Sequence, residues 1–307
     1  MSKISIINNL YLDKDKWNNC VEKAVNTNIY AFTWYLDIVS KNWEGLIYGD
    51  YELVFPIIFQ KPFFFKKIYH PLFCQQLGPF ASNTKLLHNE DVVLSILQFL
   101  VLRYKKFTFS INHHVSNLFK KIIQDNKLMI NYLDRVNLEL DLSLTHNRII
   151  SSYSTNHKRT LKLNYSNLKW DIETKINTDY INEFLASYKQ YVGFKANLTA
   201  NSHATIQSII HYALKQNIGF LIGIRDKECQ LLGAAFFIVS RNRDILLFNF
   251  SAKILNFNIM TIIIDQYIKM NVKKNKVLDF EGSNIQSLKR FYKGFGAVEK
   301  NYTHIYK

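Results

Sequence analysis

The segment from Lys276 to Lys307 constrains the fold of this chain more than any other. It opens with a short apolar run, Val277 to Phe280, which predicts a buried strand. The apolar spacing from Asn284 to Tyr292 predicts a helix, and two glycines then end it. Residues 297–306 alternate like a closing strand. The chain is therefore expected to finish as strand, helix and strand.

Polar residues cluster where the first of these strands ends, in the sequence Asp279-Phe280-Glu281-Gly282-Ser283. Ser283 or Asn284 can serve as the N-cap of the helix. A helix start presents bare backbone N–H groups that favour anions and can hold a phosphate. An ordinary strand–helix junction, in which the carboxylates only cap and turn, fits the same residues equally well.

The segment resembles the last strand–helix–strand of the GNAT acyltransferases, in the two-domain form that they share with Fem-type peptidyltransferases. Residues 279–283 match a DFEGS box, and residues 291–297 match an FY..FGA ending, of a bacterial group of GNAT-like proteins. Residues 34–37 (WYLD) and 75–79 (QQLGP) resemble further landmarks. The resemblance covers nearly the whole chain. It implies an α/β (α+β) fold of two tandem GNAT-like domains, with mixed, mostly antiparallel sheets flanked by helices.

The length of 307 residues suits two domains of about 150 residues each. A basic, polar and weakly helical stretch at 144–163 lies near the middle, so we place the boundary there. The expected domains are 1–144 and 145–307. In the resembled family a helix with an S…N..R..K pattern opens the second domain, and Ser154, Asn156, Arg159 and Lys162 occupy comparable places. A solvated linker helix explains the same residues as well.

Charge and cysteine content narrow the partners and the compartment. The formal net charge is +15, which favours nucleic acid, anionic lipid or phosphate-bearing cofactors. The three cysteines, Cys20, Cys74 and Cys229, are far apart and predict reduced thiols of a cytoplasmic protein. The first ten residues are too polar for a signal peptide, and no apolar run approaches ~18 residues. We therefore expect a soluble, basic, cytoplasmic protein.

The order of predicted elements fits two mixed units. In the first half we expect helices at 14–25, 29–39, 91–104 and 115–125, a hairpin at 45–59, a strand at 107–111 and an extended segment at 128–142. In the second half, before the closing segment, we expect strands at 168–172, 219–225, 230–240 and 244–251, and helices at 179–192, 204–216 and 258–270.

The resemblance places the pyrophosphate of an acyl donor on the loop from Ser251 to Asn258. It implies that acyl-CoA contacts Ser251, Lys253, Asn256 and Asn258 in this loop, and Ser283 and Asn284 at the last helix. Such loops ordinarily contain glycines that let the backbone approach the phosphates. This loop has none. The departure leaves aminoacyl-tRNA, the donor of Fem-like enzymes, as the alternative.

Amide formation by acyl transfer needs a general base for the amine and hydrogen-bond donors for the oxyanion. Glu281 is the candidate base, because it follows a strand end and Gly282 allows close approach. Its alternative role is to cap the following helix. Tyr292 is the candidate acid, as tyrosine serves in many GNAT enzymes; counting forward from Asn284 would put Phe291 there instead. In this scheme the first domain shapes the acceptor side.

The acceptor-side candidates are Tyr35, Asp37 and Gln75. The predicted function is transfer of an acyl group from acyl-CoA to an amine on a small molecule or cell-envelope precursor. The alternatives are aminoacyl transfer from tRNA, a non-catalytic binding module of the same fold, and a peripheral membrane protein that uses Phe63 to Lys67. His113-His114 are expected to be surface or turn residues. With no HExxH or Walker motif, we expect no metal.

Overall fold

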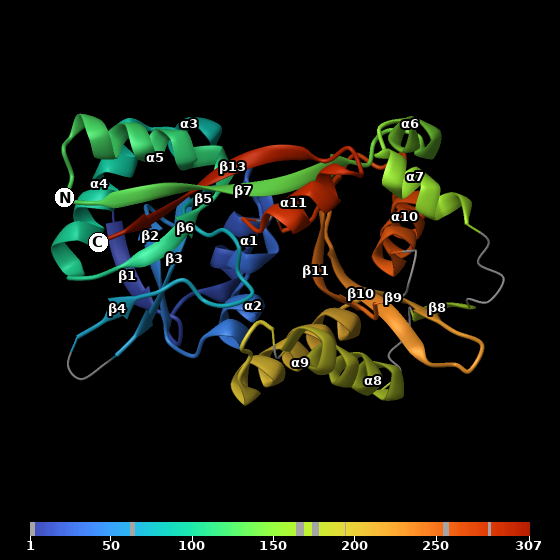
Figure 1. Cartoon of the computed structure of the whole chain (residues 1–307). Coiled ribbons are helices and arrows are strands. Elements are labelled where there is room, and N and C mark those ends of the chain that lie inside the picture. Colours follow the sequence, from blue (N-terminus) through green and yellow to red (C-terminus); the bar gives the residue numbers. More distant parts are fainter. Residues whose placement is uncertain are drawn as a thin grey trace. The chain divides into compact units, whose positions relative to one another are not determined.

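The computed structural model describes residues 4–61, 65–163, 169–173, 178–193, 195–253, 258–281 and 284–307. It is a mixed structure in which antiparallel-rich sheets are flanked by helices (Figure 1). The chain divides into two compact units. Unit 1 comprises Met1–Val136 and Lys300–Lys307, and unit 2 comprises Asn137–Glu299. The last eight residues thus join unit 1, and a domain boundary at residue 144 remains a prediction.

Unit 1 is built on an antiparallel sheet with the strand order β1-β2-β3-β4, with β5 beside β3. These strands are β1 (Ile4–Asn8), β2 (Trp43–Tyr48), β3 (Leu53–Gln60), β4 (Lys67–Ile68) and β5 (Phe80–Ala81). β6 (Thr108–Ile111) pairs antiparallel with the C-terminal part of β13 (Val298–Tyr306). The predicted hairpin at 45–59 is confirmed as β2–β3, and Gly49 and Tyr51 in its turn have φ of 62° and 59°.

The helices of unit 1 cover these strands and supply half of its core. They are α1 (Lys14–Lys23), η1 (Ile29–Ala31), α2 (Thr33–Val39), α3 (Thr84–Leu87), α4 (Glu90–Arg103) and α5 (His113–Asp125). The apolar faces of α4 and α5 pack with β2, β3 and β6. The single helix predicted at 29–39 was wrong, because Phe32 is extended (φ −68°, ψ 142°) and divides it into η1 and α2.

Unit 2 contains strands in the order β7-β12-β11-β10-β9-β8. They are β7 (Asn131–Asp141), whose end lies in this unit, β8 (Lys169–Glu173), β9 (Gly219–Arg225), β10 (Leu231–Val239), β11 (Arg243–Ser251) and β12 (Val277–Asp279). The helices are α6 (His146–Ser151), α7 (Thr155–Lys162), α8 (Thr178–Tyr188), the π-helix η2 (Lys189–Gly193), α9 (Ala200–Lys215), α10 (Ile259–Asn271) and α11 (Gln286–Lys293).

Helices cover both faces of β9, β10 and β11 (Figure 1). On one face, Phe237 of β10 stacks on Tyr267 of α10, with ring centroids 3.7 Å apart. On the other, Phe250 of β11 packs against Phe184 of α8 at 5.6 Å. Adjacent residues of a strand point to opposite faces, so the nearly continuous apolar runs of these strands fit burial on both sides.

Two predictions about the last helix and the Phe-rich segment need correction or restriction. α11 begins at Gln286, its N-cap position is Ile285, and no side chain caps it, so the predicted N-cap at Ser283 or Asn284 was wrong. Residues 284–285 form a bend, which delays the helix start.

Phe63 and Phe64 lie outside the described residues. Within the part of the chain that is described, no helix is long and apolar enough to cross a membrane.

Candidate active site

The strands β11 and β12 separate after a short parallel pairing. Arg243 lies opposite Val277, and Ile245 lies opposite Asp279. The register with β12 ends there, whereas β11 extends on to Ser251 and the chain after β12 turns away toward α11. Beyond Ile245, β11 is therefore not paired with β12. Residues of this second half of β11 line a pocket together with residues of α11.

A β-bulge lies at the start of this separated half. β10 pairs Phe236 with Phe248 and Phe237 with Leu246, so Leu247 is the extra residue on β11. A bulge removes a backbone N–H from the regular ladder, and such N–H groups can stabilise an oxyanion. Leu247 also lines the large pocket of unit 2. The bulge thus brings a potential oxyanion donor to the pocket wall.

Tyr292 and Glu281, the predicted acid and base, lie close enough in this part of unit 2 for the charge of Glu281 to act on Tyr292. The Tyr292 hydroxyl forms a hydrogen bond with the Asn249 side chain of β11, and its ring stacks on Phe280 at 4.7 Å. Burial raises the pKa of Tyr292 to about 12, and the nearby Glu281 carboxylate contributes to this rise. Burial also raises the pKa of Glu281 well above its usual range. Tyr292 thus keeps its proton at neutral pH, and Glu281 holds a proton more tightly than a solvated glutamate does.

A buried ion pair fixes the backbone that carries Glu281. Glu281 has a positive φ of 53°, and its N–H donates to Asp279 Oδ1 over 2.8 Å. The other oxygen of Asp279 accepts from Arg243 Nη1, which also donates to Glu139 Oε1 at 2.8 Å. A left-handed backbone is costly for a non-glycine residue. The hydrogen bond to Asp279 offsets part of that cost and sets the direction in which the strand end leaves the sheet.

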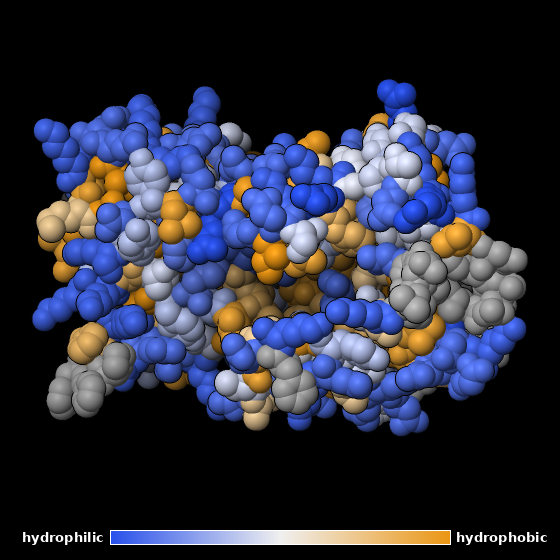
Figure 2. Space-filling view, viewed as in Figure 1, coloured by the Kyte–Doolittle hydropathy of each residue, from blue (hydrophilic) through white to orange (hydrophobic). Residues whose placement is uncertain are grey.

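An open pocket of about 760 Å³ adjoins Tyr292. One wall comes from the end of α8 and from η2, through Tyr188, Tyr191 and Val192. The opposite wall comes from the apolar side of α11, and β11 forms the floor. In Figure 2, apolar side chains are visible in the hollow beneath α11. The remaining lining residues are Lys195, Ala196, Leu247, Asn249, Phe250, Ser251, Asn258, Met260, Ile285, Ser287, Leu288 and Phe291.

His157 of α7 holds α10 and α11 together behind the pocket. Its Nδ1 lies 3.0 Å from Thr261 Oγ1, and its Nε2 lies 2.9 Å from the carbonyl oxygen of Phe291. Because a carbonyl can only accept, Nε2 carries the proton and Nδ1 accepts from the threonine. The imidazole also stacks on Phe295 at 4.1 Å. His157 therefore fixes the position of α11, and with it that of Tyr292.

The predicted donor-binding residues are only partly brought to the pocket. Ser251 and Asn258 line it, and Asn258 also caps α10 by accepting from the Thr261 N–H. Lys253 is exposed, and Asn284 is exposed in the bend before α11. Asn256 and Ser283 lie outside the described residues. A role for these six residues in binding a donor remains a prediction.

The predicted acceptor residues belong to unit 1, where the structure gives them local partners. Tyr35 is fully buried, and its hydroxyl donates to the carbonyl of Phe73. Asp37 accepts from Trp43 Nε1 at 2.8 Å and pairs with Lys14 at 2.7 Å. Gln75 accepts from the Gln76 side chain at 2.6 Å. The contacts of Asp37 join α2 to β2 and to α1. An acceptor role for the three residues remains a prediction.

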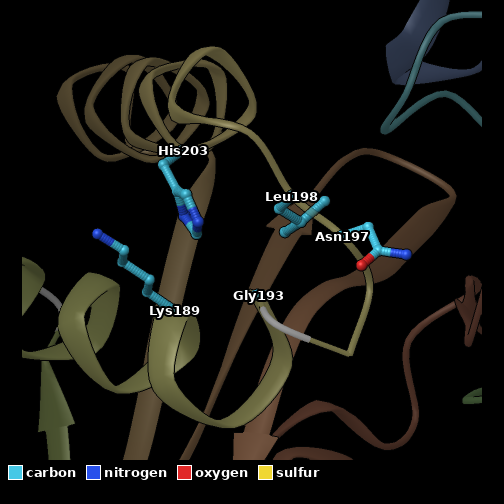
Figure 3. A pocket seen from close by; sticks show the side chains of 5 residues that line it. All are labelled: Lys189, Gly193, Asn197, Leu198 and His203. Carbon is cyan, nitrogen blue, oxygen red and sulfur yellow. The ribbon is translucent and has the colours of Figure 1, made fainter.

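A second, smaller pocket of about 310 Å³ lies between η2 and α9. Figure 3 shows the side chains of Lys189 and His203 extending into it from the two helices. Gly193, Asn197 and Leu198 complete its lining. It shares no lining residue with the large pocket, so η2 presents different residues to the two spaces.

Predictions from the sequence also concerned the paired histidines and metal binding. His113 and His114, predicted as surface or turn residues, open α5, and His114 is exposed. Their rings lie 4.2 Å apart, and the His113 N–H donates to Gln76. Among the described residues, no group of three His, Cys, Asp or Glu side chains could hold a metal ion.

Comparison with known proteins shows similarity in structure. No family model and no curated protein matches the sequence. The crystal structure of FemX has a TM-score of 0.65 at 9% identity, covering 97% of this chain and 96% of that one. L-PGS from Bacillus licheniformis has a TM-score of 0.59 at 10% identity, covering 96% and 92%. A tandem GNAT protein from the clavulanic acid biosynthesis pathway has a TM-score of 0.54 at 7% identity, covering 99% and 97%.

These similarities extend over almost the full length of each chain and establish the fold. The predicted fold class, a mixed α and β structure of the tandem GNAT and Fem-like type, is confirmed. Identities of 7–10% carry no information about the reaction. The reaction must be argued from the residues of the site.

Several site residues were missed in the sequence. Asn249 is a polar residue inside the apolar run of β11, and this interruption is a signal that could have singled it out. Tyr188 and Tyr191 gave no such signal, because their place on the pocket depends on the π-helix that follows α8. Arg243 likewise has partners 36 and 104 residues away in the sequence.

Proposed function

We propose that this chain is an acyltransferase that joins an acyl or aminoacyl group to an amine. The observation that carries the proposal is that the half-buried Glu281 lies near the buried Tyr292 in the part of unit 2 where β11 and β12 separate. A base, an acid and a bulged strand beside an apolar pocket meet the chemical needs of amide formation. Perturbed pKa values and strained backbone conformations are both enriched at functional sites.

In this proposal the ionised form of Glu281 accepts a proton from the acceptor amine as the amine attacks the acyl carbonyl. The N–H at the Leu247 bulge stabilises the oxyanion of the tetrahedral intermediate. Tyr292 then donates its proton to the leaving thiolate or alkoxide, with Asn249 holding the tyrosine hydroxyl in place. The amide product and the protonated leaving group depart, Glu281 releases its proton to solvent, and Tyr292 takes one up from solvent.

The donor in the first form of the proposal is acyl-CoA. The activated thioester would supply the electrophilic carbonyl, and Ser251, Lys253 and Asn258 at the end of β11 would bind the donor. The proposed acceptor is an amine on a small molecule or an envelope precursor. We propose a cytoplasmic setting for this reaction.

A specific observation favours aminoacyl-tRNA as the second candidate donor. The Ser154 N–H of α7 donates to the Gly294 carbonyl just after α11 over 2.8 Å, which places these two helices together in unit 2. Both helices carry exposed basic side chains: Arg159 and Lys162 on α7, and Arg290 on α11. A basic surface next to the pocket suits the phosphates of a nucleic acid.

The experiment is a thermal-shift titration with coenzyme A, acyl-CoA and bulk aminoacyl-tRNA. A ligand at ~100 times its dissociation constant stabilises the fold by about 2.7 kcal/mol. We expect one donor class to raise the melting temperature. For the coenzyme, Lys253→Ala should reduce the shift, whereas Lys215→Ala, an exposed lysine at the end of α9, should not. For tRNA the shift should fall steeply with salt. No shift with any donor would contradict the proposal.

A further inference from the structure

The two helical walls of the large pocket present unusual residues for a protein surface. On α11, Ile285, Leu288 and Phe291 follow one another at intervals of three, and all three line the pocket. Ile285 is 61% exposed and Leu288 is 41% exposed. Lys289, Arg290 and Lys293 make the rest of the helix strongly basic. An apolar stripe on such a helix is normally covered, and here it faces the pocket.

The facing wall and floor of the pocket are aromatic. Tyr188 packs its ring against Phe248 at 5.8 Å, and burial raises its pKa to about 12. Tyr191 lies parallel to Phe250 of β11, with ring centroids 5.6 Å apart and an interplanar angle of 2°. π-helical turns are often found at functional sites, and η2 places Tyr191 and Val192 on this wall. An apolar ligand would contact both walls at once.

The size of the pocket sets the scale of that ligand. Pockets of about 300–1,000 Å³ bury drug-sized ligands, and this one measures about 760 Å³. An acetyl group would leave most of the apolar wall in water. A chain of several carbons, or an aromatic group, would cover Ile285 and Leu288.

The positions of the polar groups indicate whether the acyl donor or the amine acceptor carries the apolar group. Tyr292, Asn249 and the bulged Leu247 line the pocket, whereas Glu281 is not among its lining residues. The carbonyl and the leaving group belong beside Tyr292 and the bulge, and the amine belongs beside Glu281. The substituent of the carbonyl carbon then extends into the apolar space.

We infer that the acyl group transferred is bulky and apolar, either a medium-length aliphatic chain or an aromatic group, and not acetyl. This inference rests on the proposed function for its reaction, and it adds the class of acyl group. Both candidate donors can carry such a group: an acyl thioester carries it as its acyl chain, and an aminoacyl ester carries it as a large apolar side chain.

The test measures binding to the pocket without any transfer. The probes are N-methylacetamide, N-methylhexanamide and N-methyldecanamide, which mimic product amides of increasing length and need no choice of donor. Titration by calorimetry should give affinities that rise at least about tenfold from the shortest to the longest, because each buried methylene adds apolar area. Equal affinities for the three amides, or no binding by the longest, would overturn the inference.

Two matched variants locate the binding. Leu288→Gln removes an apolar side chain from the pocket wall, whereas Met270→Gln removes one of equal exposure, 41% against 42%, at the end of α10. We expect the first to weaken decanamide binding about fivefold or more and the second to leave it unchanged. Equal effects of the two variants would overturn the inference. Length-dependent binding without transfer from any donor would remove the proposed reaction but keep the ligand class.

Discussion

The backbone N–H of Glu281 donates to the Asp279 carboxylate over 2.8 Å, and this bond links the candidate base to a buried ion pair. Asp279 is nearly fully buried and pairs with Arg243, which also binds Glu139. Burial raises the pKa of Asp279 above its usual range, while Arg243 opposes this effect. Asp279 thereby positions Glu281, the proposed base.

Substitution of Asp279 should therefore affect catalysis beyond its effect on stability. Asp279→Asn breaks a buried charge pair, which costs about 3–5 kcal/mol, and weakens the acceptor for the Glu281 N–H. We expect the pH profile of transfer to shift and its rate to fall about tenfold. The matched control is Asp244→Asn, which breaks the buried Asp244–Lys276 pair in the same sheet. Both variants should melt lower; an unchanged pH profile in Asp279→Asn would refute the positioning role.

Removal of the Tyr292 hydroxyl should slow transfer without unfolding the protein. In Tyr292→Phe the ring can still stack on Phe280, but no proton is available for the leaving group. We expect a rate loss of about 10²–10⁴-fold, smaller for donors with better leaving groups. Tyr153→Phe is the control, because that tyrosine is also buried in unit 2 but does not line the pocket. Equal rates for the two variants would contradict the acid role.

The raised pKa of Glu281 predicts a pH dependence of stability. Because the folded state holds the proton more tightly, the stabilisation is present below the ordinary glutamate pKa of about 4.3 and is lost as pH rises through the raised value. Glu281→Gln carries no such charge, so its melting temperature should fall less than that of the wild type as pH rises. Glu228→Gln, an exposed control in unit 2, should follow the wild type. Parallel curves for all three proteins would show that Glu281 is not perturbed.

The lowered pKa of His70 in unit 1 predicts the opposite dependence of stability on pH. His70 donates to the Cys74 carbonyl through Nε2 at 2.6 Å and accepts the Ser110 N–H at Nδ1, so its neutral form is required. Burial lowers its pKa to about 4 from 6.5. The unfolded chain therefore takes up a proton first, and stability is lost as pH falls from 6.5 toward 4. His70→Gln should lower this acid sensitivity, whereas the exposed His88→Gln should not.

The sequence predicted the parts of the site that depend on local pattern. Glu281 follows a strand end and Tyr292 lies on an amphipathic helix, and both features can be read from neighbouring residues. The N-cap of α11 was misplaced, because the bend at residues 284–285 cannot be recognised from the types of residue there. The aromatic wall of η2 and the partners of Arg243 could not be predicted, since both arise from packing between residues far apart in the chain.

The measurement that tests the central claim most directly is transfer of a labelled acyl group to a panel of amines. It should be run with acyl-CoA of several chain lengths and with aminoacyl-tRNA, using the wild type, Glu281→Gln and Tyr292→Phe, each first shown to be folded. We predict amide product with the wild type and a loss of about 10²-fold or more in each variant. Full activity in both variants, or no amide with any donor and amine, would contradict the account.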